Sequence, residues 1–286
     1  MRFLSVFLAT CLFLPTLFAA QFTSPSSGLV VIIHQEHLSG IRDEQAAMLP
    51  LMLRQVPTKD FGALGEVIEF FLEKNLGNPS KNDIIRAFDD SREAWAQQKA
   101  GTSRKIYMVK GKNAEGHEYM KKVYEQAIQE NDVVDVISIV HGGRELVGIP
   151  DDMSKVRLFY TSACSGKNNS GHFMNKGVHA YVGHEATSAS PLFTHAILKN
   201  WLLGKDLRTS LKDAWDEGVA IVKSPIGLTL ARMLGGYQGD ADEILVHSLI
   251  SFTTRHKQDA EKLTINSPVP PSTNNQSHVL HEETIY

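Results

Sequence analysis

Short runs of apolar, mostly β-branched residues recur along the chain and are separated by longer segments of helical pattern. Residues 29–33 and 133–140 contain very few polar side chains, which is typical of strands buried on both faces. Further strands are predicted at 104–109, 156–160 and 178–182, and helices at 43–54, 64–74, 81–100, 115–130, 190–203 and 206–222. Apolar strands separated by helices predict an α/β fold, a three-layer sandwich with a mostly parallel central sheet and helices on both faces.

The first 20 residues have the composition of a secretory signal peptide. A single arginine precedes a nearly unbroken apolar stretch, and Ala19-Ala20 supplies small residues where cleavage is expected. An uncleaved membrane anchor is the alternative, but the stretch is interrupted by Pro15 and is shorter than the roughly 20 apolar residues of a spanning helix. We therefore expect residues 1–20 to be removed and the protein to be exported, either to a periplasm or out of the cell.

The rest of the chain is expected to form one large domain followed by a tail. Residues 21–263 are enough for a single α/β domain with a substantial core. Within it, residues 224–240 contain four glycines and predict a mobile loop before a last strand or helix at 243–252; a lid over a cleft is one interpretation. Residues 264–286 are rich in polar residues and proline, which predicts a disordered tail.

The charge of the chain argues against two classes of partner. Its formal net charge at pH 7 is −3, and it has no run of lysine or arginine. Binding to nucleic acid or to an anionic membrane surface normally relies on such a basic surplus. We therefore expect no nucleic-acid partner, and no membrane association after signal cleavage.

Cys164 is the only cysteine that would remain after signal cleavage, because the chain contains two and the other is Cys11. Exported proteins usually carry cysteines as disulfide pairs, so a single cysteine is either a small buried apolar residue or a reactive thiol. The surroundings favour the second interpretation. Cys164 follows the apolar run at 156–160 and lies in Ser162-Ala163-Cys164-Ser165-Gly166, whose small side chains would leave a thiol accessible.

His141 has an equivalent position after the apolar run at 133–140, and Gly142 follows it. Because the carboxyl ends of parallel strands meet at one edge of a sheet, His141 and Cys164 are expected to share a site there. A thiol that attacks a carbonyl needs a group that transfers protons and donors that bind the developing oxyanion. His141 is the candidate for the first role, and the backbone N–H groups of Gly142 and Cys164 are candidates for the second.

These two motifs, in this order, resemble those of the caspase-like cysteine peptidases of clan CD. The stretches at 177–183, 190–193 and 201–207, with Ala214, are similar to the region after the catalytic cysteine in gingipain-like and CHAT-type members. The resemblance implies a cysteine endopeptidase that acts on a peptide or protein substrate, and no cofactor is expected. It also implies that Cys164 is the nucleophile, that His141 protonates the leaving amine, and that Gly142 and Cys164 bind the oxyanion.

Ser162 and Glu185 are the candidates for substrate binding. Members of the family select the residue before the cut through a pocket beside the nucleophile, and several that prefer arginine or lysine carry aspartate two residues before the cysteine. This chain has Ser162 at that position, and Glu185 could instead supply a carboxylate to a basic side chain. A solvated surface glutamate is the alternative, so the preferred residue stays open.

The sequence gives weaker support for a functional role of the other histidines and for the alternative functions. His34 and His37 could supply two metal ligands, but the spacing is a weak signal and no metal is expected. His172, His179, His184 and His195 are interpreted as ordinary loop or surface residues, with His184 the strongest exception because it stands at a strand end. A scaffold that binds a peptide or protein without cutting it, and acyl transfer or transpeptidation by the same thiol, are the alternative functions.

Overall fold

The computed structural model describes residues 26–33, 43–77, 79–102, 104–186, 190–235, 239–269 and 280–286. Its strands are β1 (Ser27–Ile33), β2 (Lys105–Lys110), β3 (Val133–Ile139), β4 (Val156–Thr161), β5 (Ala180–His184), β6 (Ile250–Thr254) and β7 (His281–Ile285). Its helices are α1 (Asp43–Leu53), α2 (Gly62–Leu72), α3 (Lys81–Ala100), α4 (His117–Glu130), α5 (Ser170–Asn175), α6 (Ser190–Leu202), α7 (Leu207–Lys223), α8 (Pro225–Gly235), α9 (Ala241–His247) and α10 (Asp259–Lys262). The expected signal peptide, Cys11, His34 and His37 lie outside the described residues.

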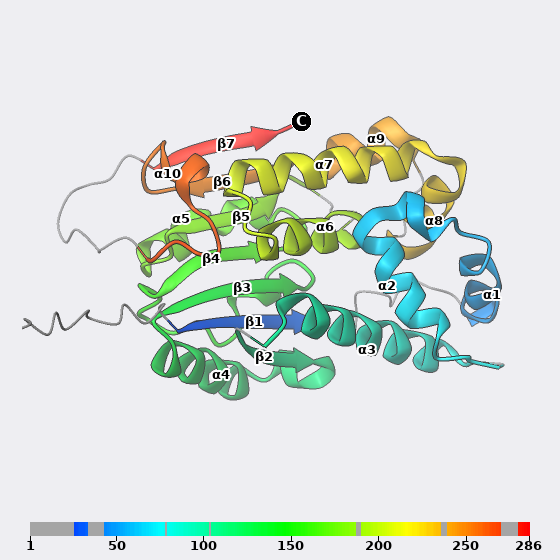
Figure 1. Ribbon diagram of the computed structural model, residues 1–286, viewed down its shortest axis with the longest axis horizontal. Helices are drawn as coiled ribbons and strands as arrows, with labels where there is room; N and C mark the ends of the chain where they lie inside the picture. Colours follow the sequence, from blue (N-terminus) through cyan, green and yellow to red (C-terminus); the bar gives the residue numbers. More distant parts are fainter. Residues whose placement is uncertain are drawn as a thin grey trace, which may run out of the picture.

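The strands form one mostly parallel sheet in the order β2-β1-β3-β4-β5-β6-β7 within the described part of the chain (Figure 1). β1 to β5 run parallel, whereas β6 and β7 each pair antiparallel with the strand before them, so β7 points the same way as β5. The chain passes from β1 to β2 on one side of β1 and then to β3 on the other. In such sheets, binding sites form beyond the carboxyl ends of the strands where the order reverses. That position lies beside the residues that follow β3.

Helices cover both faces of the sheet, which confirms the predicted α/β three-layer architecture (Figure 1). Alternate residues of a strand point to opposite faces. In β1, Leu29, Val31 and Ile33 therefore pack into one core, which α2, α3, α6 and α7 complete. Val30 and Ile32 pack into the other, which is covered by α4 and α5.

Residues 224–240 form a helix over most of their length, although the sequence predicted a mobile loop. α8 begins directly after Ser224, whose hydroxyl accepts a hydrogen bond from the backbone N–H of Gly227 (3.0 Å). Gly227 is required by close packing, because a β-carbon there would lie 1.9 Å from the carbonyl oxygen of Ile221. The prediction was wrong because this glycine reflects a close approach between helices rather than flexibility.

The C-terminal segment also differs from the disordered tail predicted for residues 264–286. β7 pairs with β6 along its whole length, and its acidic side chains have basic partners. Glu283 forms an ion pair with Arg208 of α7, and Glu282 forms one with Lys167 (3.5 Å). Backbone pairing and ion pairs thus hold a strand that composition alone marks as disordered. Residues 270–279 lie outside the described part of the chain.

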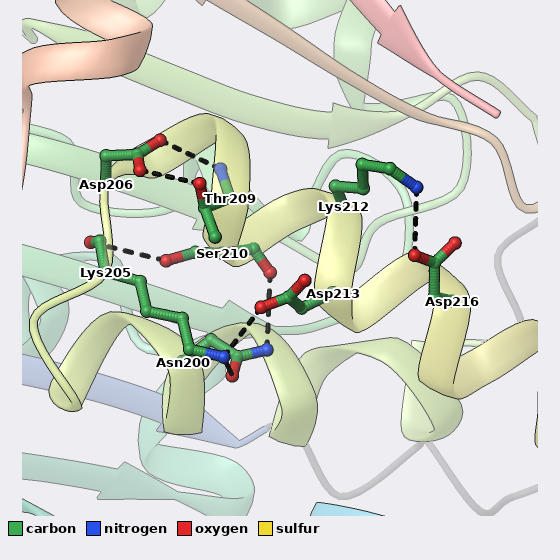
Figure 2. A network of polar contacts seen from close by, with 8 residues as sticks. All are labelled: Asn200, Lys205, Asp206, Thr209, Ser210, Lys212, Asp213 and Asp216. Carbon is green, nitrogen blue, oxygen red and sulfur yellow. Dashed lines mark hydrogen bonds and ion pairs between the residues drawn. The ribbon is translucent and has the colours of Figure 1, made fainter.

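A network of polar contacts fixes the turn between α6 and α7 (Figure 2). The carboxylate of Asp206 accepts hydrogen bonds from the backbone N–H (2.9 Å) and the hydroxyl (2.6 Å) of Thr209, and so caps α7. The ammonium of Lys205 donates to Asn200 of α6 (2.8 Å) and to Asp213 of α7 (2.6 Å). Because α6 returns from the carboxyl end of β5, this network lies at the opposite edge of the sheet and belongs to the scaffold.

Asp135 and Arg157 form an ion pair inside the protein, where both side chains are almost fully buried. The Nε of Arg157 donates to Oδ1 of Asp135 (3.0 Å), and the indole Nε1 of Trp201 donates to Oδ2 (3.1 Å). Arg157 also donates to the carbonyl oxygen of Ser267 (2.5 Å), which helps to order the start of the C-terminal segment. The pair lies toward the amino ends of β3 and β4, at the other end of the strands from His141 and Cys164.

Candidate active site

His141 lies on a tight turn just beyond the end of β3. A hydrogen bond from the N–H of Arg144 to the carbonyl oxygen of His141 (3.1 Å) closes the turn. Gly143 has a φ of 79°, a conformation that glycine adopts without strain. The side chain of His141 is half-buried, whereas Gly142 and Gly143 are exposed. The fold thus places an imidazole and an accessible glycine backbone at the carboxyl end of β3.

Cys164 lies on a second tight turn, three residues beyond the end of β4. The turn is closed by a hydrogen bond from the N–H of Gly166 to the carbonyl oxygen of Ala163 (3.0 Å). Ser165 has a φ of 54°, which is uncommon for a residue other than glycine and which is found often at functional turns. Cys164 itself is half-buried, between the buried Ala163 and the exposed Ser165.

The two turns are in contact with each other. A β-carbon built on Gly142 would lie 3.2 Å from the carbonyl oxygen of Cys164 and 4.0 Å from its β-carbon. The backbone next to His141 therefore packs directly against the nucleophile candidate, and a larger side chain at position 142 would press on it. The expectation that the two motifs share one edge of the sheet is borne out by this contact.

Ser162 joins the ends of β3 and β4 beneath the two turns. Its hydroxyl accepts a hydrogen bond from the N–H of Val140 (3.0 Å) and donates to the carbonyl oxygen of the same residue (3.3 Å). Its own N–H donates to the carbonyl oxygen of Ser138 (2.9 Å). Ser162 is 2% exposed, so its hydroxyl serves as a link between strands in this structure, and a role in substrate binding stays a prediction.

Ser162→Ala is expected to lower the free energy of unfolding by about 1–2 kcal/mol, because the buried N–H of Val140 loses its acceptor. Urea unfolding at neutral pH measures the change. Ser165→Ala is the matched control, since it removes an exposed hydroxyl from the same loop. Equal stability of the two variants would contradict the linking role.

The loop after Cys164 is fixed to β5. The hydroxyl of Tyr181 donates to the carbonyl oxygen of Gly166 (2.7 Å). Gly183 allows the loop to cross close above the strand, because a β-carbon at that position would lie 2.5 Å from the backbone nitrogen of Lys167. Local sequence patterns do not indicate a role at the site for Tyr181 or Lys167. Each is recognised only by its partner in the fold.

Glu185 already has partners in this structure. Its carboxylate forms an ion pair with Lys167 and accepts hydrogen bonds from the hydroxyl groups of Ser251 and Thr284, the latter at 3.1 Å. Partial burial favours the neutral acid, but the ammonium of Lys167 and the hydroxyl groups outweigh it and hold the pKa of Glu185 below its usual value. A basic side chain of a substrate would therefore compete with Lys167 for this carboxylate.

The other histidines near Cys164 in sequence were expected to be loop or surface residues, and burial contradicts this for three of them. His172 is exposed, whereas His179, His184 and His195 are buried. His184 accepts at Nε2 from the hydroxyl of Tyr160 (2.9 Å) and donates from Nδ1 to the carbonyl oxygen of Ser248 (3.0 Å). His184 is therefore a neutral structural residue at the end of β5.

Burial lowers the pKa of His179 and of His184 from 6.5 to about 4. Between these pH values the unfolded chain binds more protons than the folded protein, so the free energy of unfolding falls as the pH falls through this window. Between pH 7 and pH 5 the fall is expected to be smaller by about 2 kcal/mol in His184→Gln than in the wild type. Urea unfolding at the two pH values measures it, and an equal fall in both proteins would show that His184 titrates normally.

The chain was also examined for membrane-spanning helices and for similarity to known proteins. Within the part of the chain that the structure describes, no helix combines the length and the apolar composition needed to cross a bilayer. Comparison of the sequence with models of protein families and with curated proteins finds no match.

Proposed function

We propose that this protein is an exported cysteine endopeptidase that hydrolyses peptide bonds with Cys164 and His141. The observation that carries the proposal is the packing of Gly142 against Cys164, so close that a β-carbon at position 142 would lie 3.2 Å from the cysteine carbonyl oxygen. This contact brings a half-buried thiol, a half-buried imidazole and an exposed glycine backbone to one edge of a parallel sheet. Those are the groups that thiol attack on a carbonyl requires.

In the proposed reaction, the sulfur of Cys164 attacks the carbonyl carbon of the scissile bond while its proton passes to His141. The backbone N–H groups of Gly142 and Cys164 stabilise the negative charge that develops on the carbonyl oxygen. His141 then protonates the leaving amine as the C–N bond breaks, which leaves a thioester. Water hydrolyses the thioester and regenerates the thiol.

The proposed substrate is a peptide or protein, with Glu185 the stronger of the two substrate-binding candidates. Its carboxylate lies at the end of β5, next to the loop that carries the nucleophile, and it is partly exposed. Ser162 is buried under the turns. Because Lys167 neutralises Glu185, the preference for the residue before the cut depends on whether a substrate displaces this lysine.

The test is digestion of a complex peptide mixture by the mature protein, read by mass spectrometry beside the Cys164→Ala variant. Cuts made only by the wild type, with a shared residue before the cut, would support a peptidase and identify its preference. Ligated products made only by the wild type would indicate transpeptidation instead. Absence of any product, together with labelling of Cys164 by a thiol-directed electrophile, would favour a binding scaffold or a latent precursor.

A further inference from the structure

A hydrogen bond joins the turn that carries His141 to the loop that carries Cys164. Glu145 lies in the short 3-10 helix Arg144–Leu146, four residues after His141. Its Oε1 accepts a hydrogen bond from Nδ2 of Asn169 (2.7 Å). Asn169 ends the 3-10 helix Gly166–Asn169, five residues after Cys164. In each segment, the residue that forms this link therefore follows the candidate catalytic residue in the sequence.

Ser162 makes a corresponding link before the two candidate residues, because its hydroxyl forms hydrogen bonds with the backbone of Val140. One link therefore precedes both His141 and Cys164 in their segments, and the other follows both. Together with the packing of Gly142 against Cys164, the two links restrict the relative orientation of the two turns.

The burial of Glu145 is costly for stability. The residue is 1% exposed, and burial raises the pKa of its carboxyl although the hydrogen bond from Asn169 favours the ionised form. Its Oε2 has no hydrogen-bond partner among the described residues. A buried carboxyl with one oxygen unsatisfied lowers the stability of a protein. Packing alone therefore does not account for a glutamate here.

We propose that Glu145 is a positioning residue that holds the His141 turn and the Cys164 loop in the arrangement needed for proton transfer between the two side chains, an inference that rests on the proposed function. Glu145 acts through Asn169 and through its own turn, and it does not contact the substrate. A misplacement of about 1 Å can lower a catalytic rate by about 100-fold. The link therefore controls how strongly Cys164 is activated.

The experiment measures the rate of alkylation of Cys164 by iodoacetamide as a function of pH in the protein produced without residues 1–20, in which this cysteine stands alone. An imidazole that assists the thiol moves the midpoint of the profile below the ordinary thiol value of about 8.5. Glu145→Ala and Asn169→Ala should raise the midpoint by about half a pH unit or more, and should lower kcat for peptide cleavage by about 10- to 100-fold. Glu145→Gln keeps an acceptor for Asn169 and should retain most of the wild-type behaviour.

Two comparisons separate positioning from a merely structural role. The double variant Glu145→Ala/Asn169→Ala should resemble either single variant, because the same link is lost in all three. Asn131→Ala is the matched control, since it removes a buried amide that donates to Tyr107 (2.8 Å) and to the carbonyl oxygen of Ala127 (2.9 Å) at the amino end of β3. This control should lower stability and leave the alkylation profile unchanged.

An alkylation profile that does not change in Glu145→Ala, or that shifts equally in Asn131→Ala, would overturn the proposal. If Glu145→Ala does not fold, Asn169→Ala carries the same test, because Asn169 is only half-buried. Alkylation needs no peptide substrate, so the two hypotheses fail separately. A shifted profile in a protein whose wild type cuts no peptide would keep the positioning role and would favour a binding scaffold or a latent precursor over an active peptidase.

Discussion

Cys164→Ala is expected to abolish peptide cleavage, with a loss of roughly 10³-fold or more, while the protein stays folded. The loss is large because the proposed reaction passes through a thioester on this sulfur, and alanine offers no atom that can form it. The effect on stability should be below about 1 kcal/mol, because Cys164 is half-buried and lies on a turn outside both cores. Initial rates of cleavage and thermal unfolding of the same preparation measure the two effects.

His141→Ala provides the comparison for this prediction. It should slow turnover without preventing alkylation of Cys164, since the thiol remains in place and only the group that assists it is removed. Cleavage at the wild-type rate by Cys164→Ala would contradict the proposed nucleophile. Loss of cleavage together with loss of the folded state would point to a structural role for the cysteine and leave the nucleophile to be identified by labelling.

The sequence predicted the parts of the fold that depend on local patterns. α3 spans Lys81–Ala100, as predicted, because Ser80 and Asp83 form a capping box at its start and Gly101 ends it. β3 and β4 were predicted within one residue at each end, because a strand buried on both faces is mostly apolar. Since these two strands were predicted correctly, His141 and Cys164 were also placed correctly, just beyond the carboxyl ends of the strands.

Prediction from the sequence was wrong or incomplete where the role of a residue depends on a partner far away in the chain. β7 is polar, and its order comes from pairing with β6 and from Arg208 and Lys167. Gly227 in α8 reflects the close approach of the Ile221 carbonyl oxygen, which no local pattern reveals. Glu145 was not identified as a candidate, because its partner Asn169 is 24 residues away. The strands that carry the site could thus be predicted, but the side chains that support it could not.

Asp135→Ala is expected to have the largest effect on stability of the substitutions considered, with a loss of about 3–5 kcal/mol in the free energy of unfolding. Asp135 and Arg157 are almost fully buried, so the substitution leaves a guanidinium in the core without its carboxylate. It also removes the acceptor of the Trp201 indole N–H. A loss of this size is a large fraction of the roughly 5–15 kcal/mol that is typical of a folded domain. Guanidinium chloride unfolding measures it.

Two further variants show whether the loss of stability in Asp135→Ala comes from leaving a buried charge unpaired or simply from removing an ion pair. Asp216→Ala removes the partner of Lys212 in an ion pair that is more than half exposed, and it should change stability very little. Asp135→Leu/Arg157→Met removes both buried charges and should recover much of the stability lost in Asp135→Ala, because apolar side chains need no polar partner in the core. If Asp135→Ala costs no more than Asp216→Ala, the buried pair does not stabilise the scaffold. If the double variant is as unstable as Asp135→Ala, the loss arises from packing or from the indole N–H of Trp201, which lacks its acceptor in both variants, rather than from the uncompensated charge.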